Sequence, residues 1–139
     1  MTTVAVRGDT MAADSAIWVE DTLVFKIRKT HRLKNGSICG YCGTVDSALG
    51  VIRWLDGDAD EKVRFDDVTV LVLTPTGRLL KYDGEKPVPL TRAEYVAIGT
   101  GASIALGAMH QGATAIEAIK AAIAHDSKTR GPVNWLKIE

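Results

Sequence analysis

Alternating apolar and polar positions in the first 42 residues predict a series of short antiparallel strands. The strands are expected at residues 2–7, 10–14, 27–33 and 37–42. The turn signal Gly8-Asp9 separates the first two strands, and the Asn35-Gly36 pair marks a hairpin turn between the last two. Residues 16–24 have a mixed pattern to which no element is assigned. This part of the chain is therefore expected to be antiparallel β-structure.

The hydrophobic period changes from two to that of a helix at residues 45–56. Val45, Ala48 and Leu49 begin a stripe of apolar residues that continues at helical spacing along one face. Thr44 suits the N-cap position, and Gly57 suits the end of the helix. A helix is therefore predicted here, directly after the strands.

The rest of the chain combines further strands with a pair of helices. Strands are expected at residues 68–74, 78–83 and 94–99 and near the end in PVNWLKI, and helices at about 101–111 and 114–125. Thr114 and Glu117 have the spacing of a capping box at the start of the second helix. Antiparallel strands with helices outside them predict a layered α+β domain.

Length and charge place the chain among ordinary single-domain proteins. Its 139 residues suit one domain over residues 1–139, and 17 basic residues balance 17 acidic ones. Zero net charge argues against nucleic acid or an anionic membrane as the main partner. No apolar run reaches the ~20 residues of a membrane helix, and no signal-peptide pattern is seen. With two cysteines and no disulfide framework, a cytoplasmic location is expected.

The first residues, MTTVAV, suggest a catalytic N-terminus. A threonine hydroxyl is a weak nucleophile and needs a base beside it. If Met1 is removed, the free α-amine of Thr2, with a reference pKa of about 7.7–8.0, lies on the same residue as the hydroxyl. Thr2 would then carry both nucleophile and general base.

Two charged residues are candidates to tune this threonine. Asp14 ends the second predicted strand and Lys29 lies in the third, so both would lie beside Thr2 if the first three strands are antiparallel neighbours. An ammonium next to an α-amine favours the neutral amine, and a carboxylate keeps that ammonium in place. Lys26 and Arg28 are competing cations. The Lys29 ammonium is expected within about 4 Å of both Asp14 and Thr2.

Several motifs together resemble the β-type subunits of proteasomes, and most closely the bacterial two-component peptidase HslV. They are TTVAVRGDTMAADS, KIRKTHRL, the GYCG after the Asn-Gly turn, YVAIGTGA and DSKTRGPVNWLKI. Each motif is short, but the five follow in the family's order over nearly the whole chain.

The resemblance implies an α+β fold of the N-terminal-nucleophile (Ntn) hydrolase type: a four-layer αββα sandwich of two antiparallel sheets between helical layers. It implies a threonine protease in which Thr2 is nucleophile and base. The assignment of the other positions follows the family motifs. Asp14 and Lys29 would tune Thr2, and the Gly43 N–H would form the oxyanion hole. Thr100 would lie near the amine, and Asp126 and Thr129 would orient it. No cofactor and no metal are expected.

The resemblance also implies partners and an assembly. Unfolded protein would be the substrate, a homo-oligomeric ring would enclose the sites, and an ATPase unfoldase is a further partner of this family. Only one helix is predicted between Cys42 and Val68, where relatives have two. Apolar surface beside Trp54 is therefore expected to be uncovered, and the helix at 45–56 is expected to form the ring interface.

Two other functions stay open at this point. The chain could be a catalytically silent member of this fold that serves as a ring-forming scaffold. The less favoured alternative is a thiol oxidoreductase, because Cys39 and Cys42 have the C-x-x-C spacing of such enzymes. A redox site needs its first cysteine at the start of a helix, however, and the predicted helix begins several residues after Cys39.

Overall fold

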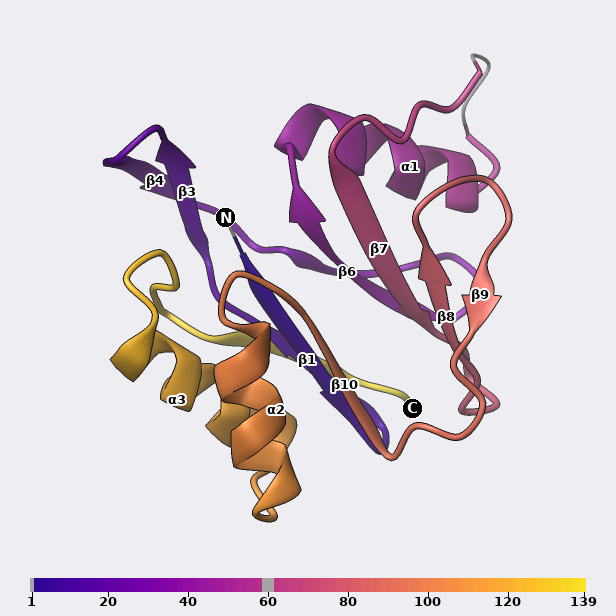
Figure 1. Ribbon diagram of the computed structural model, residues 1–139. Helices are drawn as coiled ribbons and strands as arrows, with labels where there is room; N and C mark the ends of the chain where they lie inside the picture. Colours follow the sequence, from indigo (N-terminus) through magenta and orange to yellow (C-terminus); the bar gives the residue numbers. More distant parts are fainter. Residues whose placement is uncertain (1, 59–61) are drawn as a thin grey trace.

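The computed structural model describes residues 2–58 and 62–139, and its strands form three antiparallel sheets in this part of the chain (Figure 1). The first sheet has the order β10-β1-β2-β11. Its strands are β1 (Thr3–Arg7), β2 (Thr10–Ala13), β10 (Tyr95–Gly99) and β11 (Asn134–Lys137). Pairing of β1 with both β2 and β10 places the residues that follow Thr2 at the centre of this sheet.

The second sheet has the order β5-β6-β7-β8-β9. Its strands are β5 (Thr30–Arg32), β6 (Ile38–Gly43), β7 (Val68–Leu73), β8 (Leu79–Tyr82) and β9 (Val88–Pro89). The predicted Asn-Gly turn joins β5 to β6, and Gly36 there has a φ of 87°, which favours glycine. β9 is a two-residue edge strand that contains a proline.

The third sheet is a two-stranded hairpin made of β3 (Ala16–Val19) and β4 (Thr22–Lys26), which projects from the body of the molecule (Figure 1). No element was predicted over most of it. Its turn consists of Glu20 and Asp21, and Glu20 adopts a φ of 54° without being glycine or asparagine. The usual sequence signal for a tight turn is therefore missing.

Three helices cover the outer faces of the two larger sheets (Figure 1). α2 (Ala102–His110) and α3 (Ala115–His125) lie on the first sheet, and α1 (Val45–Leu55) lies on the second. The capping box predicted for α3 is present, with Thr114 accepting from the Glu117 N–H and Glu117 accepting from the Thr114 N–H. Of the helices that the structure describes, none is long and apolar enough to cross a membrane.

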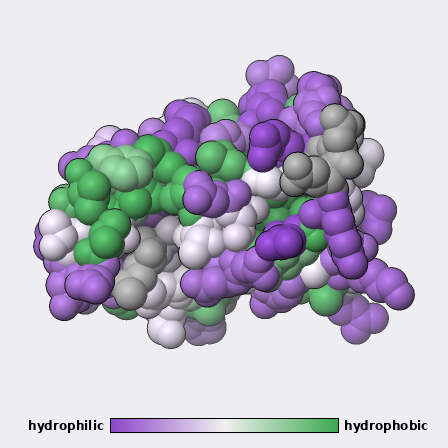
Figure 2. Space-filling view, turned by 90° about the horizontal axis from the view of Figure 1, so that it is seen from above, coloured by the Kyte–Doolittle hydropathy of each residue, from purple (hydrophilic) through white to green (hydrophobic). Residues whose placement is uncertain are grey.

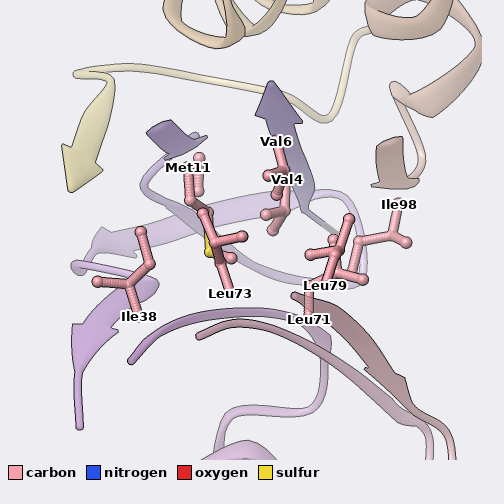
Figure 3. Close-up of a cluster of buried hydrophobic side chains, with 9 residues drawn as sticks. Val4, Val6, Met11, Ile38, Leu71, Leu73, Leu79 and Ile98 are labelled. Carbon is pink, nitrogen blue, oxygen red and sulfur yellow. The ribbon is translucent and has the colours of Figure 1, made fainter. Parts of the chain in front are cut away.

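Apolar side chains from both larger sheets form the central core (Figure 3). Val4, Met11 and Ile98 point from the first sheet toward Ile38, Leu71 and Leu73 of the second. Gly40 allows the close approach of the sheets, because a Cβ there would lie 2.8 Å from the Met11 sulfur. The α+β class predicted from the sequence is confirmed, and this core fixes the end of β1 that carries Thr2.

One expectation about an individual segment is wrong. The strand predicted at 27–33 is only β5, and Lys29 lies in the connection between β4 and β5, which belong to different sheets. The expectation of uncovered apolar surface beside Trp54 holds in part. The Trp54 ring makes edge contacts with Phe65 and Tyr82, each 5.9 Å away between ring centroids, whereas Leu49 on the same helix is exposed.

Candidate functional site

Thr2 lies directly before β1 at the edge of a surface pocket of about 690 Å³. Its backbone is held against the end of β10, where the Thr100 N–H donates to the Thr2 carbonyl oxygen at 2.9 Å. Gly99 permits this approach, since it has a φ of 100° and a Cβ would lie 1.7 Å from the Thr2 oxygen. Thr2 is 2% exposed. The expected removal of Met1 concerns a residue outside the described ones.

The Lys29 side chain is fully buried and reaches the Thr2 hydroxyl. Its Nζ donates to Thr2 Oγ1 at 2.9 Å and to Asp14 Oδ1 at 3.0 Å. It also donates to the carbonyl oxygen of Ala16 at 2.6 Å. The distances expected between Lys29, Asp14 and Thr2 are therefore confirmed. Of the strand arrangement that led to them, the antiparallel pairing of the first two strands is confirmed, and the place of Lys29 in a third neighbouring strand is wrong.

Asp14 is fixed by backbone donors from two other parts of the chain. Oδ1 accepts from the Thr3 N–H at 3.1 Å, and Oδ2 accepts from the Arg130 N–H at 3.2 Å. The carboxylate is completely buried and directly follows β2. A buried carboxylate with hydrogen bonds to both oxygens holds the Lys29 ammonium in one position.

The electrostatics of Lys29 reflect two opposing effects. Burial lowers the pKa of the Lys29 ammonium, and the adjacent Asp14 carboxylate raises it again in part. A protonated Lys29 that donates to Thr2 Oγ1 would stabilise an alkoxide on that oxygen. The competing cations lie elsewhere: Lys26 is exposed on β4, and Arg28 donates to the carbonyl oxygens of Thr30 and Trp135.

Gly43 lines the same pocket as Thr2 and lies at the end of β6, just before α1. It has a φ of 107°, and a Cβ would lie 1.9 Å from the carbonyl oxygen of Asp67. Any larger residue would therefore displace the β6–α1 connection. The adjacent Thr44 N–H donates to the same Asp67 oxygen at 2.9 Å, which fixes this connection.

Thr100, Asp126 and Thr129 form a chain of hydrogen bonds behind the pocket. Thr100 Oγ1 donates to Asp126 Oδ2 at 2.9 Å, and Thr129 Oγ1 donates to the same oxygen. Thr129 Oγ1 then accepts from Thr3 Oγ1 at 2.8 Å, and Thr3 Oγ1 accepts from the Gly101 N–H. Thr100 lines the pocket with Thr2, whereas Asp126 and Thr129 do not.

The structure therefore divides the predicted site residues into three groups. Thr2, Asp14 and Lys29 are in direct contact. Gly43 and Thr100 share the pocket with Thr2. Asp126 and Thr129 contact Thr100 and Thr3 instead of the Thr2 side chain.

Three groups that support the site are not predicted from the sequence: the Ala16 carbonyl, the Thr3 hydroxyl and the Arg130 N–H. Two of these are backbone groups, for which the sequence carries no signal. Thr3 is the first residue of β1, directly before three apolar residues, and is completely buried. Its place next to this apolar run is the sequence feature that could have identified it, because buried hydroxyl groups require partners.

Cys39 and Cys42 do not form a redox pair in this structure. Cys39 lies in the cluster between β6 and α1, and Cys42 lies against the central core on the opposite face of β6. Both are free thiols, and burial raises the pKa of Cys39 to about 12 and also raises that of Cys42. A reactive thiolate requires a lowered pKa and a redox pair requires neighbouring sulfur atoms. The two thiols lie on opposite faces of β6 and have raised pKa values, which contradicts the oxidoreductase interpretation.

Comparisons with known proteins identify the fold as proteasome/HslV-like. The solved structure of Thiobacillus denitrificans BPH is 17% identical, with a TM-score of 0.75 over 100% of this chain and 99% of that one. The same protein in complex with epoxomicin gives 16% identity and a TM-score of 0.72, over 99% of this chain and 98% of that one. Eukaryotic HslV from Trypanosoma brucei is 20% identical, with a TM-score of 0.74 over 99% of each chain. No protein-family model and no curated protein matches the sequence.

Proposed function

We propose that the protein is a threonine-type endopeptidase with the four-layer αββα fold of N-terminal-nucleophile hydrolases. The observation that carries this proposal is the buried Lys29 ammonium 2.9 Å from Thr2 Oγ1, at the edge of an open pocket. A lysine side chain is rarely buried completely unless it has a partner of opposite charge, which here is Asp14. The Lys29 ammonium also donates to the hydroxyl of Thr2, the residue that the sequence predicts to be the nucleophile.

In this proposal, removal of Met1 frees the α-amine of Thr2. The amine takes the proton from Thr2 Oγ1, and the oxygen attacks the carbonyl carbon of the scissile peptide bond. When the tetrahedral intermediate collapses, the carbon–nitrogen bond breaks and the leaving amine takes the proton from the α-ammonium. The same amine then deprotonates a water molecule, whose oxygen attacks the acyl ester. As the bond between the acyl carbon and Thr2 Oγ1 breaks, Oγ1 takes the proton back from the α-ammonium and Thr2 is regenerated. The Lys29 charge stabilises the developing alkoxide and keeps the α-amine neutral.

The remaining site residues have supporting roles in this proposal. The Gly43 N–H donates to the oxyanion of the tetrahedral intermediate, because Gly43 lines the same pocket as Thr2. Asp126 and Thr129 orient the amine through Thr100 and Thr3, whose backbones flank Thr2. Neither a metal nor a cofactor has a part in the reaction.

Substrate access is controlled by assembly in this proposal. A homo-oligomeric ring in the cytoplasm would enclose the Thr2 sites and admit unfolded chains, with an ATPase unfoldase as a partner. Apolar side chains exposed on the β3–β4 hairpin support such an assembly: Val19 is 60%, Val24 51% and Phe25 49% exposed. Figure 2 shows this hydrophobic surface at the end of the molecule where Figure 1 places the hairpin. Leu49 on α1 is also exposed and adds a smaller contribution from that helix.

The experiment that tests the activity uses a peptide epoxyketone and intact mass spectrometry. This probe reacts with a residue that presents both a hydroxyl and a free amine, because the hydroxyl adds to the ketone and the amine opens the epoxide. Wild-type protein from its native host should lack Met1 and gain one probe mass on Thr2. Thr2→Ala should gain none and should lose peptide hydrolysis by at least about 1,000-fold.

Two further variants make this experiment decisive. Thr2→Ser keeps a hydroxyl and should retain part of the activity, whereas Thr10→Ala on the neighbouring strand should behave as wild type. Equal hydrolysis by wild type and Thr2→Ala would contradict the proposal. Retention of Met1 together with an assembled ring would instead support the catalytically silent scaffold.

A further inference from the structure

Trp18 forms a wall of the Thr2 pocket from an unusual position in the β3–β4 hairpin. Its side chain is half-buried and lines the pocket next to Ile17. The pairing between β3 and β4 changes register between these two residues, so that Ile17 pairs with Phe25 and Trp18 pairs with Leu23. A bulge of this kind redirects a side chain, and here it accompanies the placement of the indole at the pocket.

Lys128, which lies 110 residues away in the sequence, contacts this indole in two ways. Trp18 Nε1 donates to the Lys128 carbonyl oxygen at 2.9 Å, and Lys128 Nζ lies 4.4 Å from the centroid of the indole ring. The ammonium also donates to Asp21 Oδ1 at 2.8 Å and to the Glu20 carbonyl oxygen at 3.4 Å. Lys128 therefore binds the ring of Trp18 and the turn of its hairpin at the same time.

The hairpin needs such an anchor. A two-stranded hairpin is marginally stable by itself, and all five residues of β4 are exposed. Figure 1 shows the segment after α3 approaching the projecting hairpin. This same segment carries the Arg130 N–H that binds Asp14 and the Thr129 hydroxyl that binds Thr3. The position of the Trp18 wall is thus coupled to the part of the chain that supports Thr2.

The pocket beside Trp18 has a mainly apolar lining. Ile17, Val45 and Val68 line it together with Trp18, and Asp67 is the one charged residue among the described lining residues. An apolar side chain of a peptide would gain free energy by leaving water here, whereas an acidic one would be repelled by the negative charge of Asp67.

We propose that Trp18 is the specificity-determining residue of the Thr2 pocket, selecting peptides with an apolar side chain at the residue whose carbonyl is attacked. Lys128 is a positioning residue that fixes the indole against that side chain. This assignment rests on the proposed peptidase function. It predicts that loss of the Lys128 side chain changes selectivity more than it changes the reactivity of Thr2.

The test compares the rates at which two peptide epoxyketones label Thr2, one with leucine and one with alanine at the reacting residue. Wild type should favour the leucine probe by at least about 10-fold, since added methylene groups are worth this factor in an apolar pocket. Trp18→Ala should lose most of this preference, and Lys128→Met should lose at least about half of it. Lys128→Arg should retain the preference, because a guanidinium also binds an indole face.

Lys86→Met is the matched control, because Lys86 is exposed in the β8–β9 connection, far from the hairpin in the sequence. Hydrogen exchange over residues 16–26 gives a readout besides labelling, and it should speed up in Lys128→Met but not in Lys86→Met. An unchanged leucine-to-alanine ratio in both Trp18→Ala and Lys128→Met overturns the assignment alone. Failure of both probes to label wild type overturns the proposed function and this assignment together.

Discussion

The polar cluster behind Thr2 and the β3–β4 hairpin beside it are neighbours with opposite properties. Lys29, Asp14 and Thr3 are completely buried and linked by hydrogen bonds from several elements. The hairpin forms a sheet of its own and exposes large apolar side chains, among them Val24 and Phe25. Both regions contribute to the same pocket, the first through Thr2 and the second through Ile17 and Trp18.

This difference matches two different physical requirements. A nucleophile needs fixed partners at hydrogen-bond distance, because small displacements reduce reactivity strongly. A surface that receives a peptide or a neighbouring subunit must instead keep apolar groups available to bind. Substitutions in the polar cluster should therefore affect both stability and chemistry, whereas substitutions in the hairpin should affect recognition.

Lys29→Met should have the largest effect on stability. It leaves the buried Asp14 carboxylate without its cation, which should lower the free energy of unfolding by about 3–5 kcal/mol. It should also lower peptide hydrolysis by at least about 100-fold, because the charge next to Thr2 Oγ1 is lost. Denaturant unfolding and initial rates measure the two effects separately.

Lys26→Met is the control for Lys29, since Lys26 is an exposed lysine three residues earlier. It should change the unfolding free energy by less than about 0.5 kcal/mol. The double variant Lys29→Met/Asp14→Asn should be more stable than Lys29→Met, because the unpaired charge is removed as well. A larger effect from Lys26→Met than from Lys29→Met would contradict the assignment of the buried pair.

Cys39 provides a contrast to Lys29, because it is a buried ionisable group that stays neutral. Burial raises the pKa of its thiol from 9.0 to about 12. Between these values the unfolded chain loses the proton while the folded protein keeps it, so stability is lost as the pH rises above 9. The loss is about 1.4 kcal/mol per pH unit, or roughly 2 kcal/mol at pH 10.5.

Unfolding measured under reducing conditions from pH 8 to 10.5 should show this loss in wild type relative to Cys39→Ala. Burial acts on the pKa of Tyr41 in the same sense, raising it from 10.0 to about 12, while the lowered pKa of Lys29 acts in the opposite sense. Both groups are present in wild type and variant, so the difference between the two proteins reports Cys39 together with its smaller effect on the pKa of Tyr41. Parallel pH profiles for the two proteins would refute a buried neutral thiol.

The sequence predicted those parts of the fold that have strong local signals. The helix at 45–56, the capping box of α3 and the Asn-Gly turn were found because periodicity, caps and turns depend on neighbouring residues. The β3–β4 hairpin was missed because its turn, Glu20-Asp21, lacks the residues that usually adopt a positive φ. Lys29 was placed in a strand because an alternating pattern extends beyond the three residues of β5.

The candidate site was predictable only in part for a related reason. Thr2, Asp14 and Lys29 could be proposed from side-chain chemistry, and Gly43, Thr100, Asp126 and Thr129 from family motifs. The contact between Trp18 and Lys128 joins residues 110 positions apart, and nothing local in either segment indicates it. Backbone partners such as the Ala16 carbonyl depend on the tertiary fold and have no side-chain signature.

Thr114→Ala tests how far the helix beneath the site supports the polar cluster. The variant removes the side chain that accepts from the Glu117 N–H and should lower the unfolding free energy by about 1 kcal/mol. Thr129 follows α3 by only four residues, so hydrogen exchange near Thr129 should increase slightly. Thr76→Ala, in the β7–β8 turn on the other sheet, is the control and should leave this exchange unchanged. An unchanged unfolding free energy in Thr114→Ala would show that the capping box contributes nothing to the domain.

Val24→Lys should have the smallest effect on stability and a clear effect on assembly. Val24 is 51% exposed and is the extra residue of the β4 bulge, so lysine can extend into solvent and the unfolding free energy should change by less than about 0.5 kcal/mol. Placed on the apolar surface of the hairpin, however, the charge must be desolvated when another subunit binds there. Light scattering at tens of micromolar should therefore show an oligomer for wild type and a monomer for Val24→Lys.

Val88→Lys is a matched control, because Val88 is 55% exposed on β9, and it should remain oligomeric. A monomeric wild type would reject the ring, since a single open subunit would leave Thr2 accessible to folded proteins.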